Sequence, residues 1–200
     1  TAAPVLALTE RPLCPETFTT LMIARPEDTQ AINYAIEKNG GIFVAVLKDD
    51  KDGSLRKVGT LAKVSKFIKL PNNCIHVFVS TLKRVNIDSL VTEPEPVPVQ
   101  ANVSDLIDKA VSEKVLTPYV RILKDLVTSL SKTQVFSFAT EVNISNFNDA
   151  DAICWYAASS LVSAPKEFLE EILESTDPKK RVNDLTSYIA GEKEILDKEE

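Results

Sequence analysis

The chain has 200 residues, a net charge of −6 at neutral pH, and a hydrophobic fraction of 44%. This length suits one large domain or two small ones with a substantial core, and the acidic balance argues against a general nucleic-acid-binding protein, which carries a basic face. With only five glycines and one histidine, most glycine-rich phosphate loops and multi-histidine metal sites are excluded. No apolar run reaches the roughly 18 residues of a membrane-spanning helix.

The first half of the chain predicts strands with one helix. Apolar and β-branched runs predict strands over residues 5–8, 19–24, 42–47, 58–64, 74–79 and 84–87. The run 42–47 is apolar throughout, which is typical of a strand buried on both faces. The two runs that flank Pro71-Asn72-Asn73 predict a hairpin. Residues 27–38 have the apolar spacing of a helix, and Asn39-Gly40-Gly41 stops it.

A proline-rich segment separates the two halves. Three prolines at alternate positions in Glu93-Pro94-Glu95-Pro96-Val97-Pro98 exclude a helix and favour an extended linker or an edge strand. We therefore expect two lobes, a β-rich lobe over residues 1–102 and a helical lobe over residues 103–200.

The second half predicts helices. We expect them over 106–115 with Ser104 as N-cap, from Thr117-Pro118 to Leu130, weakly over 135–142, over 149–162, after Ala164-Pro165, and after Asp177-Pro178. The fold class is thus α+β, a twisted β-rich lobe with one helix followed by a helical bundle that ends in a long helix. That last helix has no stop signal and the chain lacks an initiator Met, so we expect a fragment of a longer protein.

Sequence motifs for catalysis are scarce. There is no P-loop and no CxxC pair, and three scattered cysteines suit a reducing compartment. Cys74 and His76 would share one face of a strand, as a nucleophile and base require. The alternative is that they form the half-exposed face of a hairpin strand whose other face is Ile75, Val77 and Val79. From the residues alone we expect an α+β interaction module without a catalytic centre.

Several local patterns are similar to one known family. They are Pro4–Leu8 followed by Leu13-Cys14-Pro15, Met22–Arg25, Val58-Gly59-Thr60-Leu61-Ala62, Leu70–Asn73, Arg84 with Ile87, and Asp177–Leu185 followed by Glu192–Leu196. Together they resemble the N-terminal domain of the ATP-dependent Lon protease family over essentially the whole chain, and the run from Val58 to Ala62 is the most specific match. Glu16, Asn73 and Thr81 stand where that family has glycines.

The resemblance implies a domain that recognises and holds unfolded, damaged or regulatory protein substrates and helps a homo-hexamer assemble. The ATPase and Ser-Lys peptidase modules, with ATP and Mg²⁺, would lie outside this chain, which itself has no catalytic, cofactor or metal residue. No membrane or specific nucleic-acid partner is implied, and the expected location is the bacterial cytoplasm, with an organelle matrix as the alternative. Two competing hypotheses are a stand-alone adaptor of the same fold and a small enzyme that uses Cys74 and His76.

Binding of unfolded chains calls for exposed apolar side chains and free strand edges. In the β lobe the candidates are Leu13, Phe18 and Met22, which lie in or beside a proline-punctuated loop and could instead cap the β core. In the helical lobe the candidates are Val135, Phe136 and Phe138, which lie in a poorly patterned segment.

Overall fold

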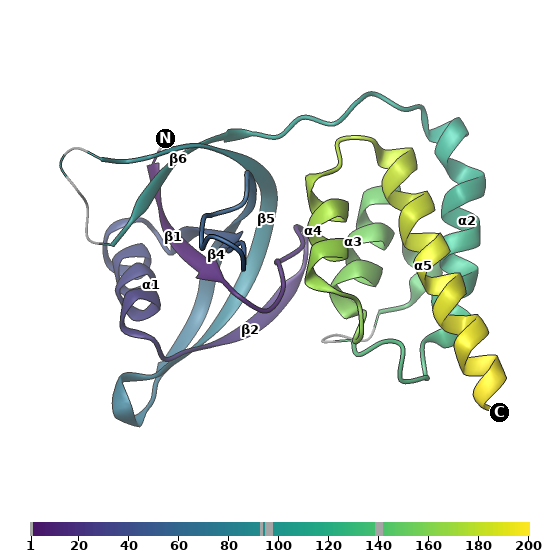
Figure 1. The fold of residues 1–200 in the computed structure, drawn as a ribbon, viewed down its shortest axis with the longest axis horizontal. Coiled ribbons are helices and arrows are strands. Elements are labelled where there is room, and N and C mark those ends of the chain that lie inside the picture. Colours follow the sequence, from purple (N-terminus) through teal and green to yellow (C-terminus); the bar gives the residue numbers. More distant parts are fainter. Residues whose placement is uncertain (1, 93, 95–97, 139–141) are drawn as a thin grey trace. The chain divides into compact units, whose positions relative to one another are not determined.

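The computed structural model describes residues 2–92, 94, 98–138 and 142–200, and they form an α+β chain, as predicted (Figure 1). Two compact units, Thr1–Leu106 and Ile107–Glu200, divide it. The first unit contains the β-sheet and one helix, and the second contains helices that end in a long one. The predicted division after residue 102 falls inside the strand Gln100–Asp105, which belongs to the first unit.

The first unit is a six-stranded sheet with the strand order β2-β5-β4-β3-β1-β6. Its strands are β1 (Ala2–Leu8), β2 (Phe18–Ile23), β3 (Ile42–Leu47), β4 (Val58–Lys69), β5 (Ile75–Leu90) and β6 (Gln100–Asp105). Because β5 also pairs with β6, the sheet closes on itself through β4, β3 and β1, while β2 extends from β5 outside that ring. Register shifts in the β4–β5 and β5–β6 pairs give the local bends that such closure requires.

Two sequence expectations are corrected in this sheet. Residues 84–87 do not form a separate strand, because the run from Ile75 continues through them as β5. The strand β6 was not expected, since its residues lie between the proline-rich segment and the predicted helix at 106–115, across the expected boundary between the two lobes. Tertiary pairing of β6 with both β1 and β5 stabilises it as a strand. Most of the proline-rich segment, residues 93 and 95–97, lies outside the described residues.

Strand β3 is buried on both faces, as predicted. Phe43 and Ala45 belong to a core cluster that includes Ile32 of the helix α1 (Pro26–Lys38). Val44 and Val46, which point the opposite way, belong to a second cluster on the other side of the strand. Full burial of each large side chain contributes roughly 1.5–3 kcal/mol, so β3 is central to the stability of this unit.

Gly59 on β4 permits the close packing of β4 against β3. A Cβ atom at this position would lie 2.9 Å from the carbonyl oxygen of Ala45 and 2.9 Å from a methyl group of both Val44 and Val46. Such contacts are far inside the normal separation of nonbonded atoms, and one of them is to backbone. The glycine in the run Val58–Ala62 is therefore a packing requirement.

The helix α1 forms between Arg25 and Asn39, close to the predicted 27–38. Pro26 occupies its first turn, where a missing N–H costs nothing. At the other end, Gly40 and Gly41 have φ angles of 61° and 81°, and the Gly41 N–H donates to the Ala35 carbonyl at 2.7 Å. The left-handed backbone of these two glycines ends α1 and confirms the predicted end of the helix.

The loop between β1 and β2 is held to the sheet by two buried threonines. Thr60 Oγ1 donates to the Leu13 carbonyl at 2.6 Å, and Thr81 Oγ1 donates to the Cys14 carbonyl at 2.7 Å. Thr81, at a family glycine position, thus provides a hydroxyl anchor for this loop. Glu16 and Asn73, at the two other such positions, adopt φ angles of 59° and 60°, in the region that favours glycine.

The second unit is built from four α-helices and a short 3₁₀ turn among the described residues. They are α2 (Glu113–Leu130), η2 (Ile144–Asn146), α3 (Ala150–Ser160), α4 (Lys166–Glu174) and α5 (Pro178–Glu199). Asp149 and Asp177 cap α3 and α5 by accepting hydrogen bonds from backbone N–H groups of the first turn, and the cap at Asp177 confirms the prediction for that residue. No helix in the described ranges is long and apolar enough to cross a bilayer.

Three helix predictions in this unit are wrong. Residues 106–112 are not helical, and Ser104 lies in β6, where it pairs with Asn86 of β5. The N-cap of α2 is Ser112, whose side chain accepts a hydrogen bond from the Val115 N–H. The predicted helix start at Thr117-Pro118 is also wrong, because α2 begins before Pro118 and continues through it to Leu130. The segment from Val135 to Phe138 is not a helix, and Phe136 instead forms an isolated β-bridge with Leu161. Residues 139–141 of the predicted piece lie outside the described residues.

A buried arginine holds the helical unit together. Arg181 of α5 is 1% exposed, donates two hydrogen bonds of 2.8 and 2.7 Å to the Asp108 carboxylate, and donates another of 2.9 Å to Asp151. It also donates to the Ser175 carbonyl and lies 5.1 Å from the centroid of the Trp155 ring. Burial lowers the pKa of Arg181, but hydrogen bonding and attraction by Asp108 and then Asp151 outweigh it, so the net shift is upward.

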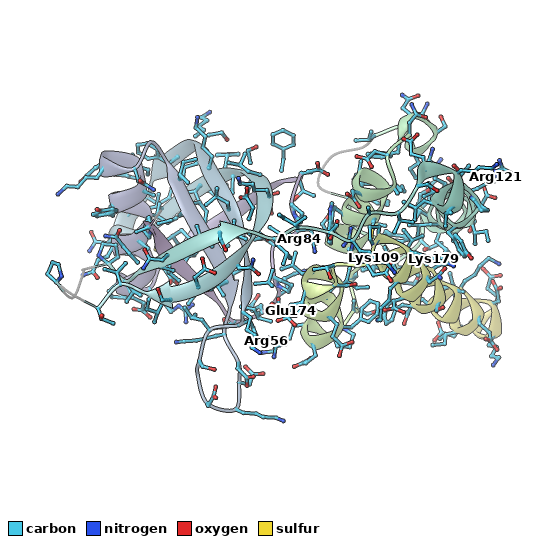
Figure 2. The ribbon with its side chains drawn as sticks, turned by 90° about the horizontal axis from the view of Figure 1, so that it is seen from above. Arg56, Arg84, Lys109, Arg121, Glu174 and Lys179 are labelled. Carbon is cyan, nitrogen blue, oxygen red and sulfur yellow. The ribbon has the colours of Figure 1, made fainter. Side chains whose placement is uncertain are left out.

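Further contacts join α5 to the start of this unit. The backbone N–H of Lys109, a residue labelled in Figure 2, donates to the Thr176 carbonyl at 2.7 Å. The ammonium of Lys179, on the first turn of α5, lies 5.0 Å from the centroid of the Tyr119 ring on α2 (Figure 2). The segment before α2 is thus fixed to the turn that precedes α5, and α2 itself contacts the first turn of α5.

Candidate functional site

Strand β2 presents large apolar side chains to solvent on one face. Phe18 and Met22 are 70% and 58% exposed, whereas Ile23, on the opposite face, is 4% exposed and belongs to the core. This alternation follows from the two-residue repeat of a strand. Two of the predicted substrate-contacting residues, Phe18 and Met22, therefore lie on one face, separated by Thr20.

The strand register extends this face across β5 and β4 in three rows. The rows are Phe18–Ser80–Lys63, Thr20–Phe78–Lys66 and Met22–His76–Ile68. Paired residues on neighbouring strands point to the same side of a sheet, about 4.8 Å apart. We call these nine residues the exposed sheet face. It lies on the opposite side from the core cluster that contains α1, because Ile75, Val77 and Val79 point into that cluster.

The centre of the exposed sheet face is aromatic. The rings of His76 and Phe78 are 4.9 Å apart, and the Lys66 ammonium lies 5.7 Å from the centroid of the Phe78 ring. Ile68 is 43% exposed at the end of its row. The sequence predicts His76 on a half-exposed strand face, but it does not predict that Phe78, Ile68 or the lysines join this face. The alternation of Phe78 with the buried Ile75, Val77 and Val79 is the signal that could have identified it. Ile68 and the lysines lie on β4 and join the face only through the register of β4 with β5.

The edge of β2 adjoins this face. β2 stands at one end of the strand order and pairs with β5, so its other edge meets no further strand among the described residues. Natural sheets protect such edges with lysine, proline or bulges. The sequence of β2, Phe-Thr-Thr-Leu-Met-Ile, contains neither charge nor proline. An extended peptide could therefore pair with it through main-chain hydrogen bonds.

Other predicted site residues are placed elsewhere. Leu13 is half-buried and packs against the core cluster below α1, which agrees with the capping alternative. Val135 and Phe136 are 5% and 6% exposed, so the expectation that they are exposed is wrong. Phe138 is half-buried, with its ring stacked on Phe136 and on Tyr156 at centroid distances of 5.2 and 4.8 Å. These aromatic residues form the interior of the helical unit because they pack against α3.

The side chains of Cys74 and His76 contact different neighbours. Cys74 lies just before β5, and its thiol points to the Asn72 carbonyl at an Sγ–O distance of 3.8 Å. The imidazole of His76 packs instead on Phe78. These contacts fit the alternative of a half-exposed hairpin face.

The described part of the helical unit has a hollow beside α2. A depression of about 420 Å³ lies between the first half of α2 and the start of α3, and its lining includes Glu113, Arg121, Lys124 and Asp149. Arg121, which projects from α2, is labelled in Figure 2. The lining has charges of both signs, so it selects no single class of ligand. Among the described residues, no cluster of His, Cys, Asp or Glu could hold a metal ion.

Known proteins match this chain over nearly its whole length. The Lon protease of Treponema pallidum is 31% identical over 199 residues, which are 96% of this chain and 22% of that protein. Lon protease 1 of Bacillus subtilis is 27% identical over 205 residues, covering 97% of this chain and 26% of that protein. The chain thus spans only 22% and 26% of these curated relatives.

Solved structures show the same fold. The N-terminal domain of a Mycobacterium avium complex Lon protease superposes with a TM-score of 0.76 at 13% identity, over 95% of this chain and 98% of that one. A Lon N-terminal domain protein from Xanthomonas campestris gives a TM-score of 0.63 at 18% identity, over 94% and 98%. A family model described as the ATP-dependent protease La (LON) substrate-binding domain matches residues 2–191. This match shows that the chain belongs to the Lon substrate-binding domain family.

Proposed function

We propose that this chain recognises and holds extended segments of unfolded, damaged or regulatory proteins on its exposed sheet face, for degradation by a Lon-type protease. The observation that carries the proposal is the pair Phe18 and Met22, which are 70% and 58% exposed on an edge strand without charge. Isolated exposed apolar residues are common on protein surfaces. Here two of them adjoin Phe78, His76 and Ile68 on one continuous face.

Unfolded segments offer two groups that this surface can bind. Their apolar side chains gain by burial against Phe18, Met22 and Phe78, at about 25 cal/mol for each Å² removed from water. Their unpaired backbone groups can pair with the free edge of β2. Folded proteins hide both groups in their cores and sheets. The surface would therefore discriminate unfolded from folded chains.

Peptide binding tests the proposal. We expect Phe18→Ser together with Met22→Ser to weaken binding of a fluorescein-labelled peptide with a Phe- and Leu-rich centre by about tenfold or more, since both anchors contribute buried area. Fluorescence anisotropy measures the affinity. The matched control is Ile122→Ser, which removes a side chain that is 52% exposed on α2. Equal affinity of the double variant and the wild type would refute binding on this face.

The parent protein and its assembly belong to the same proposal. We infer an ATP-dependent serine protease that functions as a homo-hexamer in the bacterial cytoplasm, with ATP and Mg²⁺ bound outside this chain. The bacterial relatives named Lon protease, of which the chain covers about a quarter, support this inference. A reading frame that continues past Glu200 into a P-loop would agree with it. A frame that ends there would favour the stand-alone adaptor.

A further inference from the structure

The β4–β5 hairpin region has a charge opposite to that of the protein. Between Ser54 and Ile87 the sequence has seven basic residues and no acidic residue, whereas the whole chain has a net charge of −6. Part of this charge is neutralised, because Lys83 pairs with Asp105 at 2.6 Å and Arg56 with Asp49 at 3.6 Å. Lys63 and Lys66 form no ion pair within the ranges that the structure describes.

Both of these lysines lie on the exposed sheet face. Lys63 ends the row that begins at Phe18, and Lys66 ends the row that begins at Thr20. The face therefore has an apolar side along β2 and a cationic side along β4, with Phe78 and His76 between them. None of its nine positions is acidic. A ligand that covers the whole face meets large apolar side chains at one side and two ammonium groups at the other.

From this arrangement we propose that the exposed sheet face selects extended segments in which an acidic residue follows or precedes a large apolar residue by about three positions. Two strand spacings separate the β2 side from the β4 side, which is about 10 Å, and three residues of extended chain span the same distance when the segment crosses the strands of the face instead of pairing along the edge of β2. A carboxylate placed there lies within the screening length of about 8 Å from both lysines. The inference rests on the proposed function and adds a substrate class to it.

Charge complementarity favours a peptide over a nucleic acid as the ligand. A nucleic acid would bring one phosphate per nucleotide and would bind best to a face that is cationic throughout. Here Phe18 and Met22 occupy the half of the face away from the lysines, and the chain as a whole repels polyanions. An acidic and apolar peptide satisfies both halves.

Three labelled peptides with the same apolar centre and with Asp, Ser or Lys flanks test the proposal by fluorescence anisotropy. We expect the Asp-flanked peptide to bind about three to ten times more tightly than the Lys-flanked one, because two exposed ion pairs contribute a small binding free energy of this size. The preference should vanish at about 0.5 M salt. It should also vanish in the double variant Lys63→Gln, Lys66→Gln. The charge-matched control, Lys114→Gln with Lys132→Gln, changes two exposed lysines of the helical unit and should retain it.

The outcomes separate the two proposals. If no peptide binds, the proposed function of this face fails. If all three bind equally, or if the Lys63 and Lys66 variant keeps the preference, the charge selection is refuted while peptide binding stands. If an oligothymidine displaces the Asp-flanked peptide and its own binding is unaffected by Phe18→Ser, the face is a general polyanion site, and that result also overturns the inference.

Discussion

Arg181 offers the sharpest test of what stabilises the helical unit. We expect Arg181→Met to lower the free energy of unfolding of this unit by about 3 kcal/mol. Removing one member of a buried ion pair costs roughly 3–5 kcal/mol. The lower end applies because the Asp108 and Asp151 side chains are 23% and 40% exposed and can regain water once the guanidinium is gone. Methionine fills much of the space against Trp155, so loss of packing adds little.

The two carboxylates should rank according to their geometry. Asp108 accepts two parallel hydrogen bonds from Arg181, whereas Asp151 accepts one and is more exposed. Asp151→Asn should therefore cost less than about 1 kcal/mol, as exposed pairs do, and Asp108→Asn should fall between this value and that of Arg181→Met.

The chain provides its own probe for this measurement. Trp155 is the only tryptophan, and it is buried in the helical unit beside Arg181. Its fluorescence in a urea titration therefore reports unfolding of this unit without a signal from the sheet. A shift of the midpoint with an unchanged slope measures stability. If Arg181→Met changes the stability by less than about 0.5 kcal/mol, or if Asp151→Asn costs as much as Arg181→Met, the reasoning is refuted.

Four single substitutions test the β unit and the last helix. Gly59→Ala should destabilise by about 1–3 kcal/mol, because its Cβ would meet β3 at 2.9 Å. Gly40→Ala and Gly191→Ala add the same methyl group where nothing lies within 4 Å, but they should differ in sign in thermal unfolding. The first forces alanine to a φ of 61° and costs about 1 kcal/mol, and the second gains up to about 1 kcal/mol of helix propensity. Thr81→Val should cost about 1–2 kcal/mol, since it removes the Thr81 hydroxyl from the Cys14 carbonyl, which still accepts from the Thr17 hydroxyl, and takes away the acceptor of the Thr17 N–H. Limited proteolysis should then cut the β1–β2 loop faster. Equal effects of the two open glycine changes, or an unchanged cleavage rate, would contradict these predictions.

The sequence predicts those features of the fold that depend on residues close together in the chain. Asp177-Pro178 and Asn39-Gly40 begin and end helices through groups within a few residues, and the structure confirms both. The strand β6 and the late start of α2 depend on partners far away in the chain. Ser104 has a good helix-capping side chain, yet it pairs with Asn86 of β5 in the sheet. Capping propensity is worth about 1 kcal/mol, which a ladder of strand hydrogen bonds readily exceeds.

The candidate surface was predictable in part for the same reason. Phe18 and Met22 alternate with Leu21 and Ile23, and this two-residue pattern already indicates a strand with one apolar face open. Val135 and Phe136 have no such pattern, and the sequence does not reveal that they pair with the residues just after α3. Lys63 and Lys66 join the face only through the register shift between Val64 and Lys66, since an unbroken alternation would place them on opposite sides.

The position of β1 determines when the sheet can be completed during synthesis. β1 lies between β3 and β6, and Ala2 pairs with Asn102, so the first strand to emerge waits for the last strand of its unit. At about 5–20 residues per second, a ribosome needs roughly 5–20 s to bridge that interval. Throughout it, an apolar strand has one edge unsatisfied. Early release of the nascent chain before β6 would therefore yield an open, association-prone sheet, and long-range closure makes the finished unit slow to fold.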